Sequence, residues 1–534
     1  MFELSESQQL AFNFIIENLS EKKIILLEGS AGSGKSTLTK YICNYYNEKK
    51  INICAIAPTH KSKKVIQNIL NKDIIIPIST LTVASALGKI KEHSYIGTKV
   101  YSNSTVKKLF NYSLFIIDEV SMIRDEDLKI IINYVLDSNK RLIIIGDSNQ
   151  IPSPTSKYII SDIIEKADSY IFTDEYTTKI KLKDIVRQSI DSPIIKLASS
   201  VRENLLNDLK FDLIMEATDF TNIIKYSDIY NVFETYFIKE LINSCRIITY
   251  TNSSVKHHNL EVRKHLNYNE EFVIGELMTG YSNMGWPELI IENGEDYFIE
   301  HIEDTTDHYI GKFNNLCGKL IDLIVADTRF KIKDIFFINM NHSNNSSFLN
   351  RLIELAEKIN KNNSTKIDYC NYMRLKNNAM FIEDIYKYEG GIFTENIFKE
   401  THPLLFININ EVIVENQINK SALAKKIDET YPDIVSLRIN DISKKIGDSE
   451  LFADKYKVIE KDIYYGYSIT AHKSQGSTYD TVIVDENDFQ KISNRWNHKY
   501  NKLESRVKEK NQLRYVSYTR AKNNLFVIYE KENF

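Results

Sequence analysis

The chain has 534 residues, enough for about three or four domains of ordinary size. Its 43% hydrophobic and 26% charged residues are ordinary for a globular protein, and its five cysteines contain no C-x-x-C pair that would indicate a disulfide framework or a zinc site. The net charge of −4 argues against a histone-like polycation but is compatible with an enzyme that has a local basic groove.

The chain begins with MFELSESQQL, which lacks the basic and apolar regions of a signal peptide, and no apolar run is long enough to span a bilayer. We therefore expect a cytoplasmic protein without a membrane partner, in a bacterium or in the host cell of a phage or virus. Gln8 precedes an amphipathic helical pattern at Leu10, Phe12, Ile15 and Ile16. Its amide is suited to an adenine edge, but taken alone Gln8 is more typical of an ordinary residue on a surface helix.

The segment Ile24–Thr37 reads IILLEGSAGSGKST and carries the most specific pattern in the chain. Its first four residues are apolar, as in a strand buried on both faces, and the helix-compatible segment Thr37–Tyr45 follows. Between them lies a match to G-x-x-x-x-G-K-[ST], whose backbone N–H groups and following helix bind phosphates. We expect Lys35 to reach the β- and γ-phosphates of a nucleoside triphosphate and Ser36 to bind Mg²⁺. The loop supplies the other predicted nucleotide-binding residues, which are Gly29, Ser30, Ala31, Gly32, Ser33, Gly34 and Thr37.

Polar side chains follow the next apolar strand, Ile53–Ala57, in the sequence PTHKSKK. Hydroxyl, imidazole and ammonium groups at a strand end can bind the phosphates and a stacked base of a nucleic acid, although a solvated basic turn has the same composition. A weaker polar cluster, STLT, includes Thr80. Turn signals within 88–111 predict a protruding hairpin that carries Tyr95 and Tyr101. An exposed aromatic ring there could separate a base pair, and a small packed excursion is an equally open interpretation.

Two further apolar strands, Leu114–Ile117 and Leu142–Ile145, each end in a polar motif. After the first, Asp118 is expected to hold Mg²⁺ and Glu119 to orient and deprotonate the attacking water. After the second, in GDSNQIP, Gln150 can sense the γ-phosphate. Open α/β sheets bind ligands at the carboxyl ends of their strands, so we expect these motifs to share one site.

Two arginines are suited to stabilise the charge of a phosphoryl transition state. Arg187 in LKDIVRQ and Arg520 in YVSYTRA are candidate arginine fingers, with ordinary salt bridges left open as the alternative. A second set of strands restarts at Arg246–Thr251, ends at Asn252 and has no second P-loop. Core-like residues return at Tyr464–Thr470, followed by AHKSQGS. Between them, 294–460 alternates β-prone pieces with Asn- and Ser-rich breaks, which predicts an inserted accessory domain.

The motifs GSAGSGKST, APTHKSKK, STLT, DEVSM, GDSNQIP, LKDIVRQ, AHKSQGS and YVSYTRA occur in the order of the motif ladder of superfamily 1 helicases. Within that superfamily the chain most resembles the 5′-to-3′ class, the RecD- and Dda-like helicases. The resemblance extends to LSESQQLAFN, TLTKYI, SPIIKLASSVREN and TNSSVKHHN. It covers about residues 1–294 and 464–534 and is weak between them.

The resemblance implies roles for individual residues. Gln8 matches the adenine-reading glutamine, and Gly476 falls among the nucleotide-binding positions. The residues expected to bind the triphosphate and the metal and to take part in hydrolysis are Lys35, Ser36, Asp118, Glu119, Gln150, Arg187 and Arg520. Single-stranded DNA would contact Pro58, Thr59, His60, Lys61, Thr80, Asn252 and His472, and Tyr95 or Tyr101 would fall on the strand-separating pin.

The fold implied by the resemblance is α/β, with two RecA-like P-loop NTPase domains of parallel sheets flanked by helices. The first would span 1–195 and carry a hairpin insertion at 89–112. The second would combine 196–293 with 461–534. The inserted domain, 294–460, would hold an SH3-like element and extra helices.

The activity implied by the resemblance is that of an ATP-dependent DNA helicase that moves 5′-to-3′ on single-stranded DNA and unwinds duplex in replication, recombination or repair. ATP and Mg²⁺ would be its cofactors. We expect a monomer whose partners are single-stranded DNA and single-strand/double-strand junctions, with a single-strand-binding protein or replication and recombination proteins as candidates. Two alternatives remain at this stage, namely an RNA helicase of the same superfamily and a P-loop ATPase that remodels protein complexes without unwinding.

Overall fold

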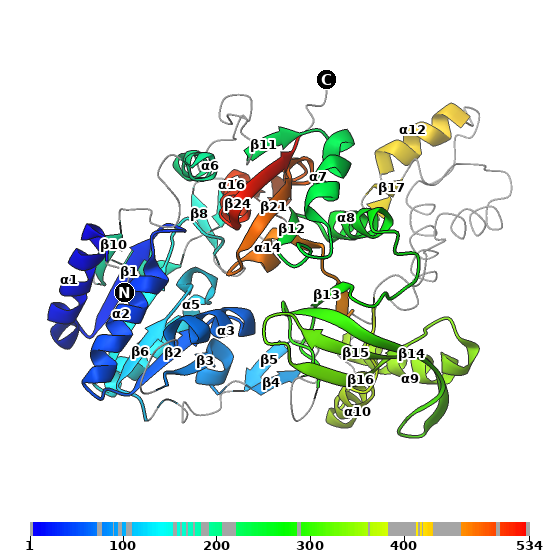
Figure 1. Cartoon of the computed structure of the whole chain (residues 1–534), viewed down its shortest axis with the longest axis horizontal. Coiled ribbons are helices and arrows are strands. Elements are labelled where there is room, and N and C mark those ends of the chain that lie inside the picture. The colour runs from blue at the N-terminus through cyan, green and yellow to red at the C-terminus, as the bar shows by residue number, and fades with distance from the viewer. Residues whose placement is uncertain are drawn as a thin grey trace.

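Two parallel sheets flanked by helices and one antiparallel sheet form the architecture of the chain (Figure 1). The structure is a computed structural model, and it describes residues 4–71, 77–88, 90–93, 99–102, 109, 111–152, 157–160, 163–166, 169–174, 177–182, 192–204, 221–285, 290–360, 364–382, 413–414, 417–418, 420–430, 461–497 and 502–529.

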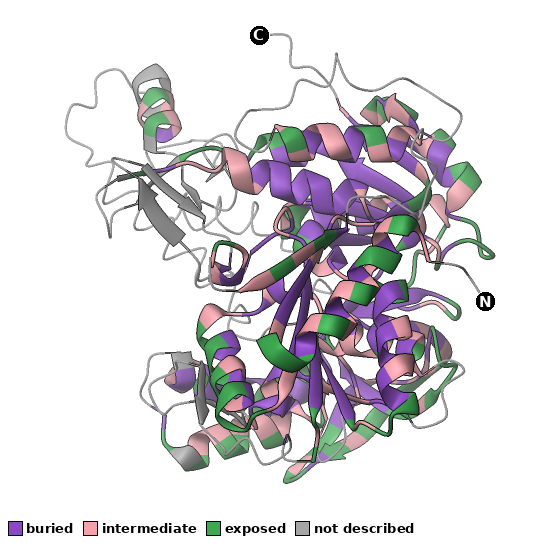
Figure 2. Cartoon of the chain, turned by 90° about the vertical axis from the view of Figure 1, so that its left-hand side faces the viewer, coloured by how far each residue is buried: buried purple, intermediate pink, exposed green. Residues whose placement is uncertain are grey.

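The first sheet contains the P-loop strand and has the order β10-β1-β7-β6-β2-β3, with every strand parallel to its neighbours. Its residues alternate between two buried faces: Leu26 and Phe115 point to one, and Leu27 and Ile116 point to the other. Because helices cover both faces, the strands read as continuous apolar runs, and Figure 2 shows these buried strands behind helices with exposed outer sides. We call this sheet with its helices the first α/β unit. It contains β1 (Ile24–Gly29), β2 (Ile53–Ala57), β3 (Ser79–Thr82), β6 (Leu114–Ile117), β7 (Arg141–Gly146), β10 (Thr178–Leu182), α1 (Glu6–Lys22), α2 (Lys35–Glu48), α3 (His60–Leu70), α4 (Val83–Ala86) and α5 (Asp125–Asp137).

The second α/β unit is built on a parallel sheet of order β11-β24-β21-β12-β20. It lies above the accessory sheet and to the right of the first unit in Figure 1. Two parallel sheets, each flanked by helices, confirm the predicted fold class. The unit contains β11 (Thr221–Ile224), β12 (Cys245–Thr249), β20 (Ser468–Thr470), β21 (Tyr479–Asp485), β24 (Ala521–Ile528), α6 (Pro193–Glu203), α7 (Ile229–Tyr236), α8 (Asn252–His265), α14 (Ala471–Ser474), α15 (Glu486–Gln490) and α16 (Val507–Tyr518).

The third sheet, which we call the accessory sheet, is antiparallel and has the order β16-β15-β14-β13-β19. Two of its strands, β13 (Leu277–Gly280) and β19 (Ile463–Tyr465), lie outside the 294–460 range expected for the insertion. The accessory sheet therefore extends into the chain on both sides of that range. Its other elements are β14 (Asp296–Ile310), β15 (Phe313–Val325), β16 (Lys331–Ile338), α9 (Ser346–Asn360) and α10 (Lys366–Lys376).

The apolar run Tyr464–Thr470, where core-like residues return, is divided between two sheets. Its first part pairs with β13 as β19, and its last part pairs with β12 as β20. Gly466 lies between them, where a Cβ atom would be 2.7 Å from Thr279 Oγ1. An apolar run by itself does not reveal which sheet each of its residues joins.

Short strands complete the described structure. The hairpin β4 (Ile90–His93) and β5 (Lys99–Ser102) lies within the predicted insertion at 89–112. A small sheet links distant parts of the chain, since β9 (Ile163–Lys166) pairs with both β8 (Lys157–Ile160) and β23 (Lys502–Glu504), and β23 also pairs with β22 (Arg495–Asn497). The remaining elements are β17 (Ile413–Val414), β18 (Gln417–Ile418) and α12 (Lys420–Thr430). Within the described ranges, no helix combines the length and apolarity needed to cross a bilayer.

Candidate functional site

The P-loop connects β1 to α2, which begins at Lys35 rather than at the predicted Thr37. Gly32 and Gly34 have φ angles of 82° and 77°, a backbone region that favours glycine. A Cβ atom at Gly29 would lie 2.6 Å from Ser33 Oγ, so a larger residue there would displace the Ser33 side chain. Ser36 and Thr37 occupy the first turn of α2, where helix N–H groups are oriented toward a phosphate.

The Lys35 side chain folds back over the loop, and its ammonium donates to the carbonyl oxygens of Gly29 (2.6 Å) and Ser30 (2.9 Å). An ammonium on two neutral carbonyl groups is available to a more strongly accepting phosphate oxygen.

Gln8 is buried at the start of α1 and supports the same loop. Its Nε2 donates to Gly34 O (3.2 Å), and its Oε1 accepts from the backbone N–H of Ser5 (2.9 Å). The capping box formed with Ser5 fixes the beginning of α1 against the P-loop. The adenine contact expected of Gln8 stays a prediction.

Asp118 and Glu119 follow β6 directly. Burial and the neighbouring Glu119 raise the pKa of Asp118 to about 7, while Lys35 lowers it. Glu119 has a φ angle of 51°, which is uncommon for a residue with a side chain, and its buried Oε2 has no hydrogen-bond partner among the described residues. The donor set of Ser36 hydroxyl and Asp118 carboxylate fits Mg²⁺, a hard cation that prefers oxygen, and the Glu119 oxygen fits a bound water.

The two α/β units meet over the P-loop through Tyr515 of α16. Its hydroxyl accepts the backbone N–H of Ala31 (3.0 Å) and donates to Asp147 Oδ2 (2.8 Å). Burial and the Asp147 carboxylate raise the pKa of Tyr515 well above its ordinary value, so the hydroxyl keeps its proton. A second contact joins Gln475 Nε2 to Gln150 Oε1 (3.1 Å).

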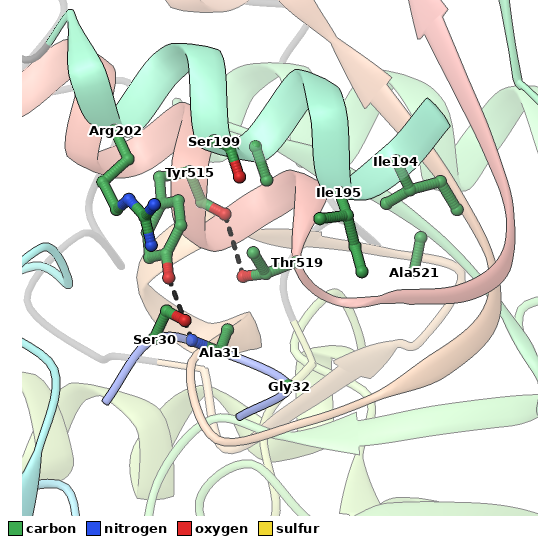
Figure 3. A pocket seen from close by; sticks show the side chains of 11 residues that line it. Ser30, Ala31, Gly32, Ile194, Ile195, Ser199, Arg202, Tyr515, Thr519 and Ala521 are labelled. Carbon is green, nitrogen blue, oxygen red and sulfur yellow. Dashed lines mark hydrogen bonds between the residues drawn. The ribbon is translucent and has the colours of Figure 1, made fainter. Parts of the chain in front are cut away.

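Figure 3 shows the cleft beside the Tyr515–Ala31 hydrogen bond, with the P-loop on one side and α6 and α16 on the other. Arg202 of α6 lies beside Tyr515 and carries a positive charge into this cleft. Sequence reasoning missed Tyr515 and Arg202 because YVSYTRA and SPIIKLASSVREN marked the segments but not the side chains that face the loop. The lining residues are Ser30, Ala31, Gly32, Ile194, Ile195, Ala198, Ser199, Arg202, Tyr515, Thr519 and Ala521.

Arg520 lies between Thr519 and Ala521, which line the cleft, but its side chain points into the second α/β unit. Its guanidinium donates to Val516 O (2.9 Å), Ser477 O (2.9 Å) and Thr519 Oγ1 (3.1 Å), and 6% of the residue is exposed. To reach a γ-phosphate, the Arg520 guanidinium would have to exchange these hydrogen bonds for bonds to the phosphate oxygens. Arg187, the other candidate finger, lies outside the described residues.

The predicted nucleic-acid residues lie at the edges of both units. Pro58 and Thr59 connect β2 to α3, with His60 and Lys61 in the first turn of α3, and the Thr59 hydroxyl caps that helix. Across the units, a Cβ atom at Gly476 would lie 3.1 Å from Ser62 Oγ, so α3 and the segment after α14 are close neighbours. The other predicted residues that can be placed are Thr80 in β3, Asn252 at the start of α8, His472 in α14 and the backbone of Tyr101 in β5. Tyr95 lies outside the described residues.

Comparisons with known proteins find several similar sequences and structures. The sequence profile of a family described as an AAA domain matches residues 3–216. An uncharacterized protein of Acanthamoeba polyphaga mimivirus is 26% identical over 524 residues, covering 91% of this chain and 94% of its own length. The ATP-dependent DNA helicase dda of Enterobacteria phage T4 is 28% identical over 324 residues, covering 57% of this chain and 69% of its own.

The ATP-dependent RecD2 DNA helicase of Deinococcus radiodurans is 24% identical over 184 residues, which cover 34% of this chain and 22% of that protein. Among solved structures, the Pif1 helicase from Candida albicans aligns with 99% of this chain and 95% of its own, at 14% identity and a TM-score of 0.46. The ordered motifs and the sequence similarity to dda and RecD2 make the chain similar to superfamily 1 helicases of the 5′-to-3′, Dda- and RecD-like class.

Proposed function

We propose that the protein is an ATP-dependent DNA helicase that moves 5′-to-3′ on single-stranded DNA and unwinds duplex ahead of it. The observation that carries this proposal is the bridge formed by Tyr515. It joins the P-loop of one α/β unit to a helix of the other, so nucleotide chemistry at the loop is coupled to the spacing of the two units.

In this proposal the first unit provides the chemistry. Lys35 holds the β- and γ-phosphates, Ser36 and Asp118 hold Mg²⁺, and Glu119 orients the attacking water. Mg²⁺ supplies charge neutralisation on the phosphates when it is bound. Gln150 reports the state of the γ-phosphate to the second unit through its bond with Gln475.

The second unit provides the motion. Predicted nucleic-acid residues lie on both units, with His60 on α3 and His472 on α14. Closing and reopening of the cleft changes the distance between these two sets, so each set can grip the strand in a different part of the cycle. Single-stranded DNA is therefore the proposed track, with junctions and single-strand-binding or replication and recombination proteins as further candidate partners.

The first test is ATP hydrolysis measured with and without an oligonucleotide. We expect single-stranded DNA to increase the rate strongly, and RNA of the same sequence to do so much less. Equal rates with and without DNA would contradict the coupling, and stimulation by RNA alone would indicate an RNA helicase.

The second test is strand displacement on forked duplexes with either a 5′ or a 3′ single-stranded tail. We expect unwinding of substrates with a 5′ tail. Exclusive use of 3′ tails would overturn the proposed direction while leaving the ATPase assignment intact.

A further inference from the structure

An acidic turn of the accessory sheet lies against the first turns of α3. Lys64 Nζ is 2.8 Å from Glu295 Oε2 and 3.3 Å from Glu292 Oε2. His60 Nδ1 is 3.9 Å from Glu292 Oε2. The helix segment proposed to hold a nucleic-acid strand is thus paired with carboxylates of this chain.

The same turn also contacts the second α/β unit. Lys473 of α14 donates to Asn293 Oδ1 (2.8 Å) and to Gly280 O (3.2 Å), and its ammonium lies 3.7 Å from the centre of the Tyr281 ring. Residues 292–296, which we call the acidic turn, therefore contact both α3 and α14, the helices that carry predicted nucleic-acid residues of the two units.

The carboxylates of the acidic turn differ in what holds them. Asp296 is bonded to the buried Arg246 (2.7 Å) and anchors the turn in the protein. The side chains of Glu292 and Glu295 pair, within the described part of the chain, only with cations of α3. Burial raises the pKa of Glu295, and the neighbouring carboxylates Asp327 and Glu292 add to this rise while Lys64 opposes it.

The two pairs differ in exposure. The side chains of Lys64 and Glu292 are 32% and 22% exposed, and ion pairs within reach of solvent contribute little net stability, whereas the Glu295 side chain is only 7% exposed and its pair with Lys64 costs more to break. A nucleic-acid phosphate carries the same charge as a carboxylate and accepts from the same ammonium groups. Because a strand carries many phosphates and releases counterions when it binds, it can compete with two carboxylates.

We infer that Lys64 and Lys473 are further phosphate contacts for a single strand, and that Glu292 and Glu295 occupy the cationic groove until a strand displaces them. This inference rests on the proposed function. It assigns the acidic turn a regulatory role, since the protein binds a strand only after the accessory sheet gives up its ion pairs with α3.

The test removes the two charges and keeps the shape of the side chains. Binding of a fluorescently labelled oligothymidylate is followed by anisotropy for the wild-type chain and for the variant Glu292→Gln/Glu295→Gln. We expect the variant to bind about three- to tenfold more tightly at low salt, because the strand no longer has to break the pairs. Its ATPase activity should then reach half of its maximal stimulation at a correspondingly lower DNA concentration.

A matched control removes a carboxylate of the same sheet whose ion pair lies within the accessory sheet and not with α3. Glu300 forms an ion pair with Lys331 of β16, so Glu300→Gln should leave DNA affinity unchanged. In the opposite direction, Lys64→Met and Lys473→Met should each weaken binding and make it less sensitive to salt. The single variants Glu292→Gln and Glu295→Gln serve the same purpose if the double variant does not fold.

Different failures have different meanings. If the wild-type chain does not bind the oligonucleotide, the proposed function is wrong. If the wild-type chain binds it and loss of the two carboxylates leaves affinity unchanged or reduced, the regulatory role of the acidic turn is wrong and the proposed function stands. Unchanged binding and salt dependence in both lysine variants would overturn their assignment as phosphate contacts.

Discussion

The bridge formed by Tyr515 gives a quantitative prediction for the variant Tyr515→Phe. Phenylalanine keeps the ring but removes the hydroxyl that joins the Ala31 N–H to the Asp147 carboxylate. The closed cleft would then hold an unpaired N–H group, and the Asp147 side chain, 1% of that residue being exposed, would keep only its bonds from Asn149 among the residues that the structure describes. In an open cleft, water can satisfy both groups.

The magnitude follows from these two contacts. A hydrogen bond to a charged group contributes about 1.5–3 kcal/mol, and an unsatisfied buried group costs about 1–3 kcal/mol. Allowing for partial entry of water, we expect the closed arrangement to lose about 2–4 kcal/mol. At 1.36 kcal/mol per factor of ten, this lowers kcat for DNA-stimulated ATP hydrolysis by roughly 30- to 1000-fold if hydrolysis requires closure.

The assay is steady-state ATP hydrolysis at saturating single-stranded DNA, together with thermal unfolding. Tyr518→Phe is the matched control, because Tyr518 also lies on α16 and is buried but bonds Glu486 (3.2 Å) within its own unit. We expect the control to lower the Tm and keep kcat, and Tyr515→Phe to lower kcat. A Tyr515→Phe enzyme with wild-type kcat, or an equal loss of kcat in both variants, would refute the reasoning.

Three further predictions concern single side chains. Lys35→Ala should retain binding of an oligonucleotide but lose at least about 100-fold in the rate of ATP hydrolysis, because the charge on the phosphates is no longer stabilised. Loss of strand binding in the same variant would contradict the separation of the two sites. Burial and the cations Lys461 and Lys61 lower the pKa of Lys473 to about 7. A bound phosphate would raise that pKa, so binding takes up a proton and DNA affinity should fall as the pH rises above about 7, whereas Lys473→Arg, which stays charged, should remove this dependence. Arg514→Met leaves the buried carboxylate of Glu486 without its ion-pair partner and should lower the free energy of unfolding by about 3–5 kcal/mol in a denaturant titration, and a change below about 1 kcal/mol would show that the pair is not structural.

The P-loop and the strand-end motifs were predictable because they are local. In the P-loop, the glycines, Lys35 and Ser36 act within one strand–loop–helix segment, so their spacing along the chain is their spacing in space. The carboxylates at Asp118 and Glu119 follow a strand that is apolar on both faces, and parallel strands bring their carboxyl ends to one edge. The sequence by itself therefore determined the α/β class of the fold and the placing of these motifs at the carboxyl ends of the strands, while the nucleotide-binding roles of their residues stay predictions.

Other features depend on contacts between residues far apart in the chain. Tyr515 meets Ala31 across 484 positions, and Lys64 meets Glu295 across 231. Nothing in the local pattern distinguishes Tyr515 from Tyr518, although one joins the two units and the other packs inside its own. The division of Tyr464–Thr470 between two sheets and the extension of the accessory sheet beyond 294–460 likewise follow from pairing partners rather than from residue type. Only the tertiary structure decided these features, because hydrogen bonds and ion pairs form between groups that folding brings together, and a linear pattern carries no record of which distant group that will be.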